Sequence, residues 1–229
     1  MKIKQLITSF VLGLAISVAH ADLVKDKDYT ELSKPIPQIN QNKIEVLEFF
    51  AYFCIHCKNL ESDLMEYVKQ LPSDTYFRQS HVVWDDESIN LARIAAAVNS
   101  SGTMFQANKE IFNVMFHEDK NQRLNLNNPT IFKEWVNTKG SWGKAVLHAY
   151  NSPNNIVEAN LMKKSTIDYG ITSTPQIIVG GKYQLNSHDM NKLTELINLV
   201  RQERNMPQVS STKKYKTNIS SRLHQKANR

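Results

Sequence analysis

The sequence contains very little cysteine: only Cys54 and Cys57 among 229 residues, three positions apart. A structural disulfide normally closes a longer loop, because a longer loop removes more entropy from the unfolded chain. A bridge across two intervening residues constrains very little, so a purely structural role is disfavoured. A structural zinc site needs four ligands, and the low cysteine count disfavours it too. Cys54, His56 and Cys57 nevertheless leave a metal-binding module open as an alternative.

Proline is absent between the first cysteine and Pro72, and this segment carries apolar residues at helical spacing. They are Leu60, Leu64, Val68 and Leu71. A run over 44–53, rich in β-branched and aromatic residues, precedes the segment and predicts a buried strand. The pattern therefore predicts a strand that ends in Cys-x-x-Cys and opens a helix, which is typical of a thiol redox motif.

The start of this helix gives the two cysteines different predicted roles. The partial positive charge of a helix N-terminus stabilises the thiolate of Cys54, the predicted nucleophile. Cys57 lies one turn further and is predicted to be the buried partner that resolves mixed disulfides. An imidazole at His56 favours a neighbouring thiolate by charge or by hydrogen bonding; the alternative is a surface histidine without a role. A stabilised thiolate makes the closed disulfide a stronger oxidant, so the sequence favours disulfide donation.

No internal repeat is present, and the parts of the chain differ in character. A strand, a helix and a second strand between 44 and 84 predict a βαβ unit with parallel strands. A mostly helical pattern follows, and Gly180-Gly181 then marks a hairpin turn. We expect an α/β, thioredoxin-like fold that is split by a helical insertion. The predicted boundaries are 22–86 and 165–206 for the discontinuous thioredoxin-like domain and 87–164 for the insertion.

An acidic residue and a proline complete the candidate site. Glu48 stands inside the apolar strand, where a carboxylate is costly unless it is partnered or protonated. It is either a proton relay under Cys57 or a residue that faces solvent on a sheet edge. Thr174-Pro175 precedes a short strand, and in thioredoxin-like folds a cis-proline at such a place faces the cysteine pair. The backbone of Thr174 would then pair with an extended substrate peptide; the alternative is an ordinary trans proline.

The first residues are predicted not to belong to the fold. Lys2 and Lys4 precede an apolar stretch, and Ala19-His20-Ala21 fits the small-x-small rule for cleavage. Residues 1–21 are therefore predicted to be a cleaved signal peptide. We expect the mature chain to be exported to the periplasm, an oxidising compartment.

The tail over 207–229 dominates the net charge, since it has six basic residues and no acidic one. Without these six and the two leading lysines, 20 of the 28 basic residues remain against 22 acidic ones. The body of the chain therefore gives no case for nucleic-acid binding. The tail is predicted to be disordered, and whether it contacts anionic lipid is left open.

Together these residues resemble the DsbA family of bacterial periplasmic thiol oxidases. The matching stretches are Tyr29-Thr30, Lys34-Pro35, Val46 to Phe50, Phe53-Cys54, His56-Cys57, Glu61, Pro175 and Gly181 to Asn186. The resemblance implies that Cys54 reacts first, that Cys57 resolves, and that the loop with Pro175 binds substrate. It implies no cofactor besides the redox-active disulfide. It also implies reduced, exported proteins as substrates and a quinone-linked membrane oxidase, similar to DsbB, as the reoxidising partner.

Two positions depart from the family's pattern. Ile55 replaces the proline of Cys-Pro-His-Cys, and proline would constrain the first helical turn. Thr174 stands where an apolar residue is frequent in these oxidases, and its hydroxyl could bond a cysteine sulfur. Both changes bear on the redox balance, so a disulfide isomerase or reductase of the same fold stays as an alternative. A chaperone without redox activity is an alternative from another class.

Overall fold

The computed structural model describes residues 23–209, and the structural statements below concern that part of the chain. The predicted signal peptide and residues 210–229 of the predicted tail lie outside the described residues. The elements in chain order are β1 (Tyr29–Glu31), β2 (Ile44–Phe50), α1 (Ile55–Val68), β3 (Thr75–His81), α2 (Ile89–Ser101), α3 (Met104–Met115), α4 (Pro129–Asn137), α5 (Gly140–Tyr150), α6 (Pro153–Asp168), β4 (Gln176–Val179), β5 (Tyr183–Leu185) and α7 (Met190–Glu203), with short 3-10 helices at Asp86–Ser88 and Lys120–Gln122.

A five-stranded sheet with the strand order β1-β5-β4-β2-β3 forms the centre of the molecule. Strands β2 and β3 are parallel and are joined through α1, which confirms the predicted βαβ unit. The other neighbouring strands are antiparallel. Strands β4 and β5 form the predicted hairpin, and Gly180 and Gly181 turn between them with positive φ angles of 63° and 69°. Such angles suit glycine because it has no Cβ.

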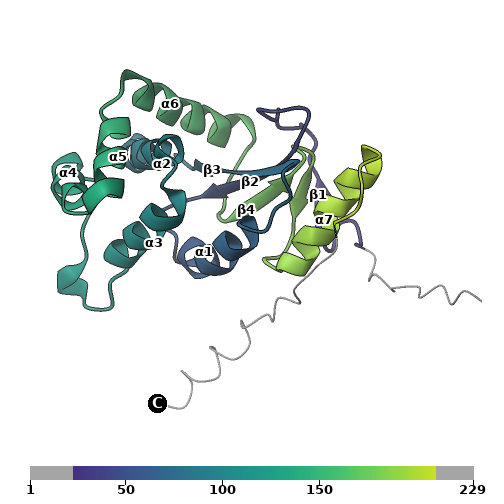
Figure 1. Cartoon of the computed structure of the whole chain (residues 1–229), viewed down its shortest axis with the longest axis horizontal. Coiled ribbons are helices and arrows are strands. Elements are labelled where there is room, and N and C mark those ends of the chain that lie inside the picture. Colours follow the sequence, from purple (N-terminus) through teal and green to yellow (C-terminus); the bar gives the residue numbers. More distant parts are fainter. Residues whose placement is uncertain (1–22, 210–229) are drawn as a thin grey trace, which may run out of the picture.

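Helices cover both faces of the sheet (Figure 1). Helices α1 and α7 lie on one side, and Leu64 and Leu193 pack there against the side chains of Val46 and Ile177. Helices α2 to α6 all fall between β3 and β4 in the chain. This order of elements is the predicted thioredoxin-like sheet interrupted by a helical segment.

The interrupting helices pack directly against the end of the sheet where the cysteines lie. Phe50, Tyr52 and Cys57 share one buried cluster with apolar side chains from α2 to α6, including Ile94 and Phe112. Burial of a large apolar side chain contributes about 1.5–3 kcal/mol, so this cluster holds the helices firmly to the sheet. The cluster also keeps water away from Cys57.

Two strands end earlier than the sequence predicts. Strand β2 ends at Phe50 instead of residue 53, because the chain turns through Ala51–Phe53 to reach the start of α1. Strand β3 ends at His81 instead of residue 84, which places Trp84 in the connection to α2. Apolar periodicity continues through both turns, and for that reason it did not mark the strand ends.

Candidate active site

Cys54 is the residue that caps the N-terminus of α1, with an extended backbone at φ −94° and ψ 116°. Its side chain is half-buried. The Sγ atom accepts a hydrogen bond from the backbone N–H of Cys57 at 3.4 Å. A backbone donor and the helix dipole both favour negative charge at this sulfur, so they stabilise the thiolate form.

Cys57 lies one turn further along α1 and is only 1% exposed. Burial raises the pKa of its thiol well above the ordinary value of 9.0, and the charge of Glu48 raises it further. Cys57 is therefore the buried sulfur, as the sequence predicts, and Cys54 is the more exposed one. Their roles as resolving cysteine and nucleophile stay predictions.

The loop before β4 faces Cys54. The peptide bond between Thr174 and Pro175 is cis. The carbonyl oxygen of Thr174 lies 3.5 Å from the Sγ of Cys54 and accepts its hydrogen bond. Thr174 is half-buried, and His56 lies exposed in the first turn of α1. The structure thus brings Cys54, Cys57 and Thr174 together, while the catalytic roles of His56, Thr174 and Pro175 stay predictions.

Glu48 is 1% exposed, so the alternative of a solvent-facing edge residue is wrong. It lies on β2, which runs between β3 and β4 in the sheet and is covered on both faces. The Nε2 of Gln79 donates a hydrogen bond to its carboxyl group at 2.7 Å. Burial raises the pKa of Glu48 from 4.5 to about 7, although the bond from Gln79 opposes the shift. At neutral pH this carboxyl group is therefore poised to hold or release a proton.

A second buried carboxyl group, Glu61, lies one helical turn after Cys57 and is 7% exposed. Burial, followed by the charge of Glu48, raises its pKa from 4.5 to about 8. Its Oε1 has no hydrogen-bond partner among residues 23–209. In the sequence Glu61 stands out only through the family resemblance, because one glutamate in a helix is usually exposed.

Amide side chains connect the region around Glu48. The Oε1 of Gln79 accepts from Asn108 at 2.6 Å, and Asn108 accepts from the hydroxyl of Tyr52 at 2.7 Å. The parallel register of β2 and β3 puts Gln79 beside Glu48, while Asn108 comes from α3. Sequence reasoning missed these two amides, because only the strand register and the packing of α3 bring them to the site.

His81 fixes the turn that leads into Cys54. Its Nε2 accepts the backbone N–H of Tyr52 at 3.0 Å, and its Nδ1 lies 2.7 Å from the carbonyl oxygen of Val82. Burial lowers the pKa of His81 from 6.5 to about 3. The imidazole is therefore neutral at physiological pH, with Nε2 as the acceptor and Nδ1 as the donor.

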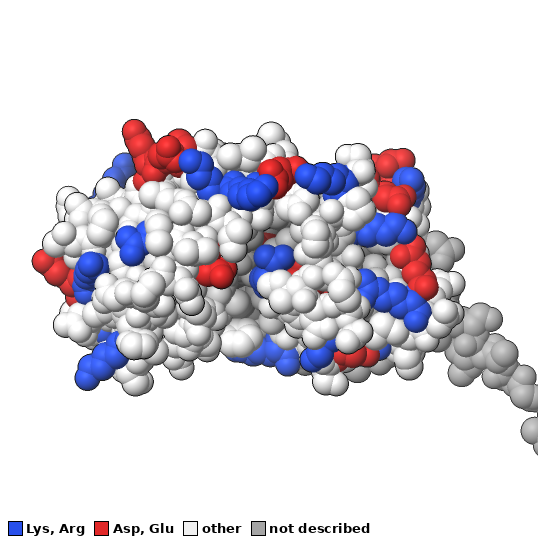
Figure 2. Space-filling view, turned by 90° about the horizontal axis from the view of Figure 1, so that it is seen from above, with Lys and Arg blue, Asp and Glu red and all other residues white. Residues whose placement is uncertain are grey.

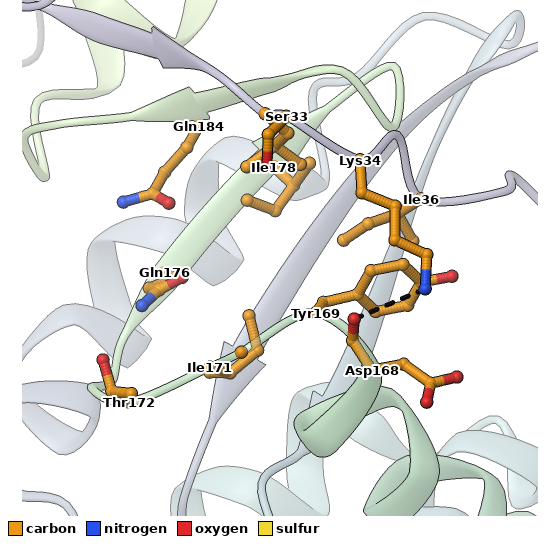
Figure 3. A pocket seen from close by; sticks show the side chains of 12 residues that line it. Ser33, Lys34, Ile36, Asp168, Tyr169, Ile171, Thr172, Gln176, Ile178 and Gln184 are labelled. Atoms are coloured by element: carbon orange, nitrogen blue, oxygen red, sulfur yellow. Dashed lines mark hydrogen bonds between the residues drawn. The ribbon is translucent and has the colours of Figure 1, made fainter.

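A cavity of about 500 Å³ lies between the segment after β1, the end of α6 with the residues that follow it, and strands β4 and β5 (Figure 3). Ile36, Ile171 and Ile178 form its apolar wall, and Lys34 crosses one end, where its Nζ is 5.2 Å from the centre of the Tyr169 ring. Basic and acidic side chains are interspersed on the face of the molecule that Figure 2 shows. The cavity borders the loop that carries Thr174 but does not contain either cysteine.

Within residues 23–209, no group of three or more histidine, cysteine or acidic side chains is arranged to hold a metal ion. The metal-binding alternative therefore gains no support from the geometry. None of the helices in the described part combines the length and apolar character needed to cross a membrane.

Comparison with known proteins identifies the family. No family model matches the chain. The thiol:disulfide interchange protein DsbA of Burkholderia cepacia is 30% identical over 187 residues, which are 79% of this chain and 86% of that protein. The chain belongs to the DsbA family. It is accordingly a thiol:disulfide oxidoreductase, and its redox-active group is the cysteine pair.

Solved structures of DsbA proteins agree with the observed architecture. The oxidoreductase NmDsbA1 of Neisseria meningitidis has a TM-score of 0.74 and 40% identity, covering 81% of this chain and 98% of that one. NmDsbA3 from the same organism has a TM-score of 0.70 and 45% identity, covering 80% and 100%. These similarities confirm the predicted thioredoxin-like fold with its helical insertion.

Proposed function

We propose that this DsbA-family protein oxidises thiol pairs in newly exported proteins by passing on a disulfide between Cys54 and Cys57. The observation that carries the proposal is the placing of the outer sulfur. Cys54 caps a helix and accepts a backbone N–H, and both features favour its thiolate. The carbonyl of Thr174, 3.5 Å from the sulfur, accepts from the protonated thiol and belongs to the proposed substrate-binding loop. A stabilised thiolate favours the reduced protein, so its oxidised form gives up its disulfide readily.

The reaction transfers two electrons from the substrate to the protein. A substrate thiolate attacks Cys54, the bond between Cys54 and Cys57 breaks, and Cys57 leaves as a thiolate. A second substrate thiolate then attacks the substrate sulfur of the mixed disulfide and releases Cys54 as a thiolate. The substrate gains one disulfide, and the protein ends with both cysteines reduced.

The buried sulfur needs a proton when it leaves. Burial disfavours the Cys57 thiolate, and the carboxyl group of Glu48 holds a proton near neutral pH. Glu48 is the proposed donor in this direction and the acceptor when the protein is reoxidised. Thr174 and Pro175 are the proposed substrate-binding residues, and His56 is proposed to favour the thiolate of Cys54.

Reduced proteins of the periplasm are the proposed substrates, and a quinone-linked membrane oxidase similar to DsbB is the proposed reoxidant. Support comes from family membership and from the signal-peptide pattern at the start of the sequence. The proposed cofactor is the disulfide itself.

Disulfide transfer to a reduced model protein tests the proposal directly. The oxidised chain should create one substrate disulfide per molecule without added oxidant, and Cys54→Ser should create none. Refolding of scrambled ribonuclease by the reduced chain distinguishes an isomerase from an oxidase, since an oxidase performs this reaction poorly. Efficient rescue of scrambled ribonuclease together with no transfer from the oxidised chain would reject the oxidase function.

A further inference from the structure

Trp84 connects the two chain segments that form the active site. It lies just beyond β3 and is 46% exposed, which is high for a side chain of this size. Its indole Nε1 nevertheless donates a hydrogen bond to the carbonyl oxygen of Ile171 at 2.6 Å, across 87 positions of sequence. Nothing in the reaction steps above uses this contact.

Ile171 is the first residue of the loop over 171–175, which is the proposed substrate-binding loop before β4. Its backbone N–H bonds to the carbonyl of Thr166 near the end of α6 at 3.0 Å, so both backbone groups of Ile171 are held. The residues that follow, 172–174, are exposed or half-buried. Few buried contacts hold such a segment, so the position of the loop depends strongly on its anchor points.

The other side of the indole reaches the cysteine pair. The rings of Trp84 and Phe53 are 5.9 Å apart with an interplanar angle of 57°. Phe53 immediately precedes Cys54, and its ring also lies 5.8 Å from that of His81. One side chain therefore spans from the residue beside the nucleophile to the residue that opens the loop.

We propose that Trp84 is a positioning residue that sets the distance between the substrate-binding loop and Cys54 through its N–H bond to Ile171. The assignment rests on the proposed role of Thr174 in pairing with substrate peptides. A tryptophan is suited to this task, because its ring packs on an aromatic neighbour while its N–H bonds a polar group at the edge. Loss of that bond lets the loop move away from the sulfur, which weakens substrate binding more than it changes the chemistry of transfer.

Trp84→Phe is the decisive variant, since it keeps an aromatic six-membered ring that can pack against Phe53 and removes the N–H donor together with the five-membered ring that carries it. One net hydrogen bond is worth about 1 kcal/mol, or about fivefold in an equilibrium constant. The concentration of a reduced dithiol peptide that half-saturates its oxidation should therefore rise about fivefold, while the maximal rate changes less than about twofold. Backbone amide exchange at Ile171, whose N–H is held by the carbonyl of Thr166, should quicken by about the same factor when it is followed by mass spectrometry.

Phe105→Leu is the matched control. Phe105 is a comparably exposed aromatic residue (43%) near Lys69, at the end of α1 away from the cysteines. This variant should leave half-saturation and loop exchange unchanged. An unchanged half-saturating concentration in Trp84→Phe overturns the proposal, and so does a change of the same size in Phe105→Leu. Unaccelerated exchange in the loop overturns it as well.

The exchange measurement does not depend on turnover. If the unsubstituted chain fails to oxidise the peptide, the proposed function fails, while the exchange rate still decides whether Trp84 anchors the loop.

Discussion

At the scale of single residues, the function depends on the different environments of the two cysteine sulfurs at the start of α1. Cys54 is half-buried and accepts a backbone N–H, whereas Cys57 is buried and keeps its proton. The reactivity of a cysteine follows its thiolate fraction and its access to the partner. The outer sulfur should therefore make every first contact with a substrate.

Single substitutions of the cysteines test this asymmetry. Cys57→Ser should form a stable mixed disulfide with a peptide that carries an activated disulfide, because no second thiol is left to resolve it. Cys54→Ser leaves only the buried thiol of Cys57. This variant should react at least about 100-fold more slowly, because the thiolate fraction of Cys57 is low. Gel shift under non-reducing conditions gives both rates. Equal rates for the two variants would contradict the assignment of Cys54 as the nucleophile.

Glu48→Gln tests proton transfer at the buried sulfur. The amide keeps the shape of the side chain and can still accept from Gln79, but it cannot exchange a proton. Reoxidation of the reduced pair should slow about tenfold or more. In the unsubstituted protein the rate of this step should rise with pH through about 7, the pKa of Glu48. Stopped-flow reoxidation across pH measures both effects.

The control for this test is Asp63→Asn, which removes a charge from the exposed side of α1, the helix that carries Cys57. It should leave the rate and its pH profile unchanged. A Glu48→Gln variant with the rate and pH profile of the unsubstituted protein would show that another group carries the proton.

At the scale of secondary-structure elements, the β4–β5 hairpin holds the segment that connects β1 to β2. Gly181 has a positive φ of 69°, and a Cβ added there would lie 2.0 Å from the carbonyl oxygen of Ile36. The N–H of Ile36 in turn donates to the carbonyl of Gly181 at 2.7 Å. The close backbone approach explains why the turn needs glycine at this position.

Gly181→Ala should therefore destabilise the protein by about 3 kcal/mol, since both the backbone strain and the steric overlap must be relieved. Gly102→Ala is the matched control: Gly102 also has a positive φ, of 68°, but nothing lies within 4 Å of the added Cβ. It should cost about 1 kcal/mol, from the left-handed conformation alone. Urea unfolding monitored by circular dichroism gives both values, and equal losses would contradict the overlap at Ile36.

The elements were largely predictable from the sequence, whereas the polar site was only partly so. Apolar periodicity and glycine pairs report local structure, and they predicted the βαβ unit, the hairpin and the order of strands and helices. They could not decide whether Glu48 faces inward, because that depends on the cover of both sheet faces by distant segments. Gln79 and Asn108 join the site only through strand register and helix packing, and neither leaves a local signal.

At the scale of the whole molecule, two buried carboxyl groups should make stability depend on pH. Their folded-state pKa values, about 7 for Glu48 and about 8 for Glu61, exceed the ordinary 4.5. The folded protein therefore binds more protons than the unfolded chain from pH 4.5 up to these values, and stability must fall as the pH rises through this window.

The free energy of unfolding of the reduced protein should fall by roughly 2–3 kcal/mol between pH 5 and 8 for Glu48 alone. Glu48→Gln should flatten this dependence and make the protein more stable than the unsubstituted chain at pH 8. Denaturant unfolding at a series of pH values measures the effect. Stability that rises over this range would show that these carboxyl groups are charged and partnered in the folded state.

The redox equilibrium tests the central claim, that the folded protein favours a thiolate at Cys54 over a closed disulfide. The measurement is the reduction potential of the Cys54–Cys57 pair, obtained by equilibration with glutathione buffers. Known reference potentials are about −120 mV for DsbA and about −270 mV for thioredoxin. The potential of the Cys54–Cys57 pair should lie closer to the DsbA value. A potential as low as that of thioredoxin would contradict the claim, because such a pair would accept disulfides from substrates and not donate them.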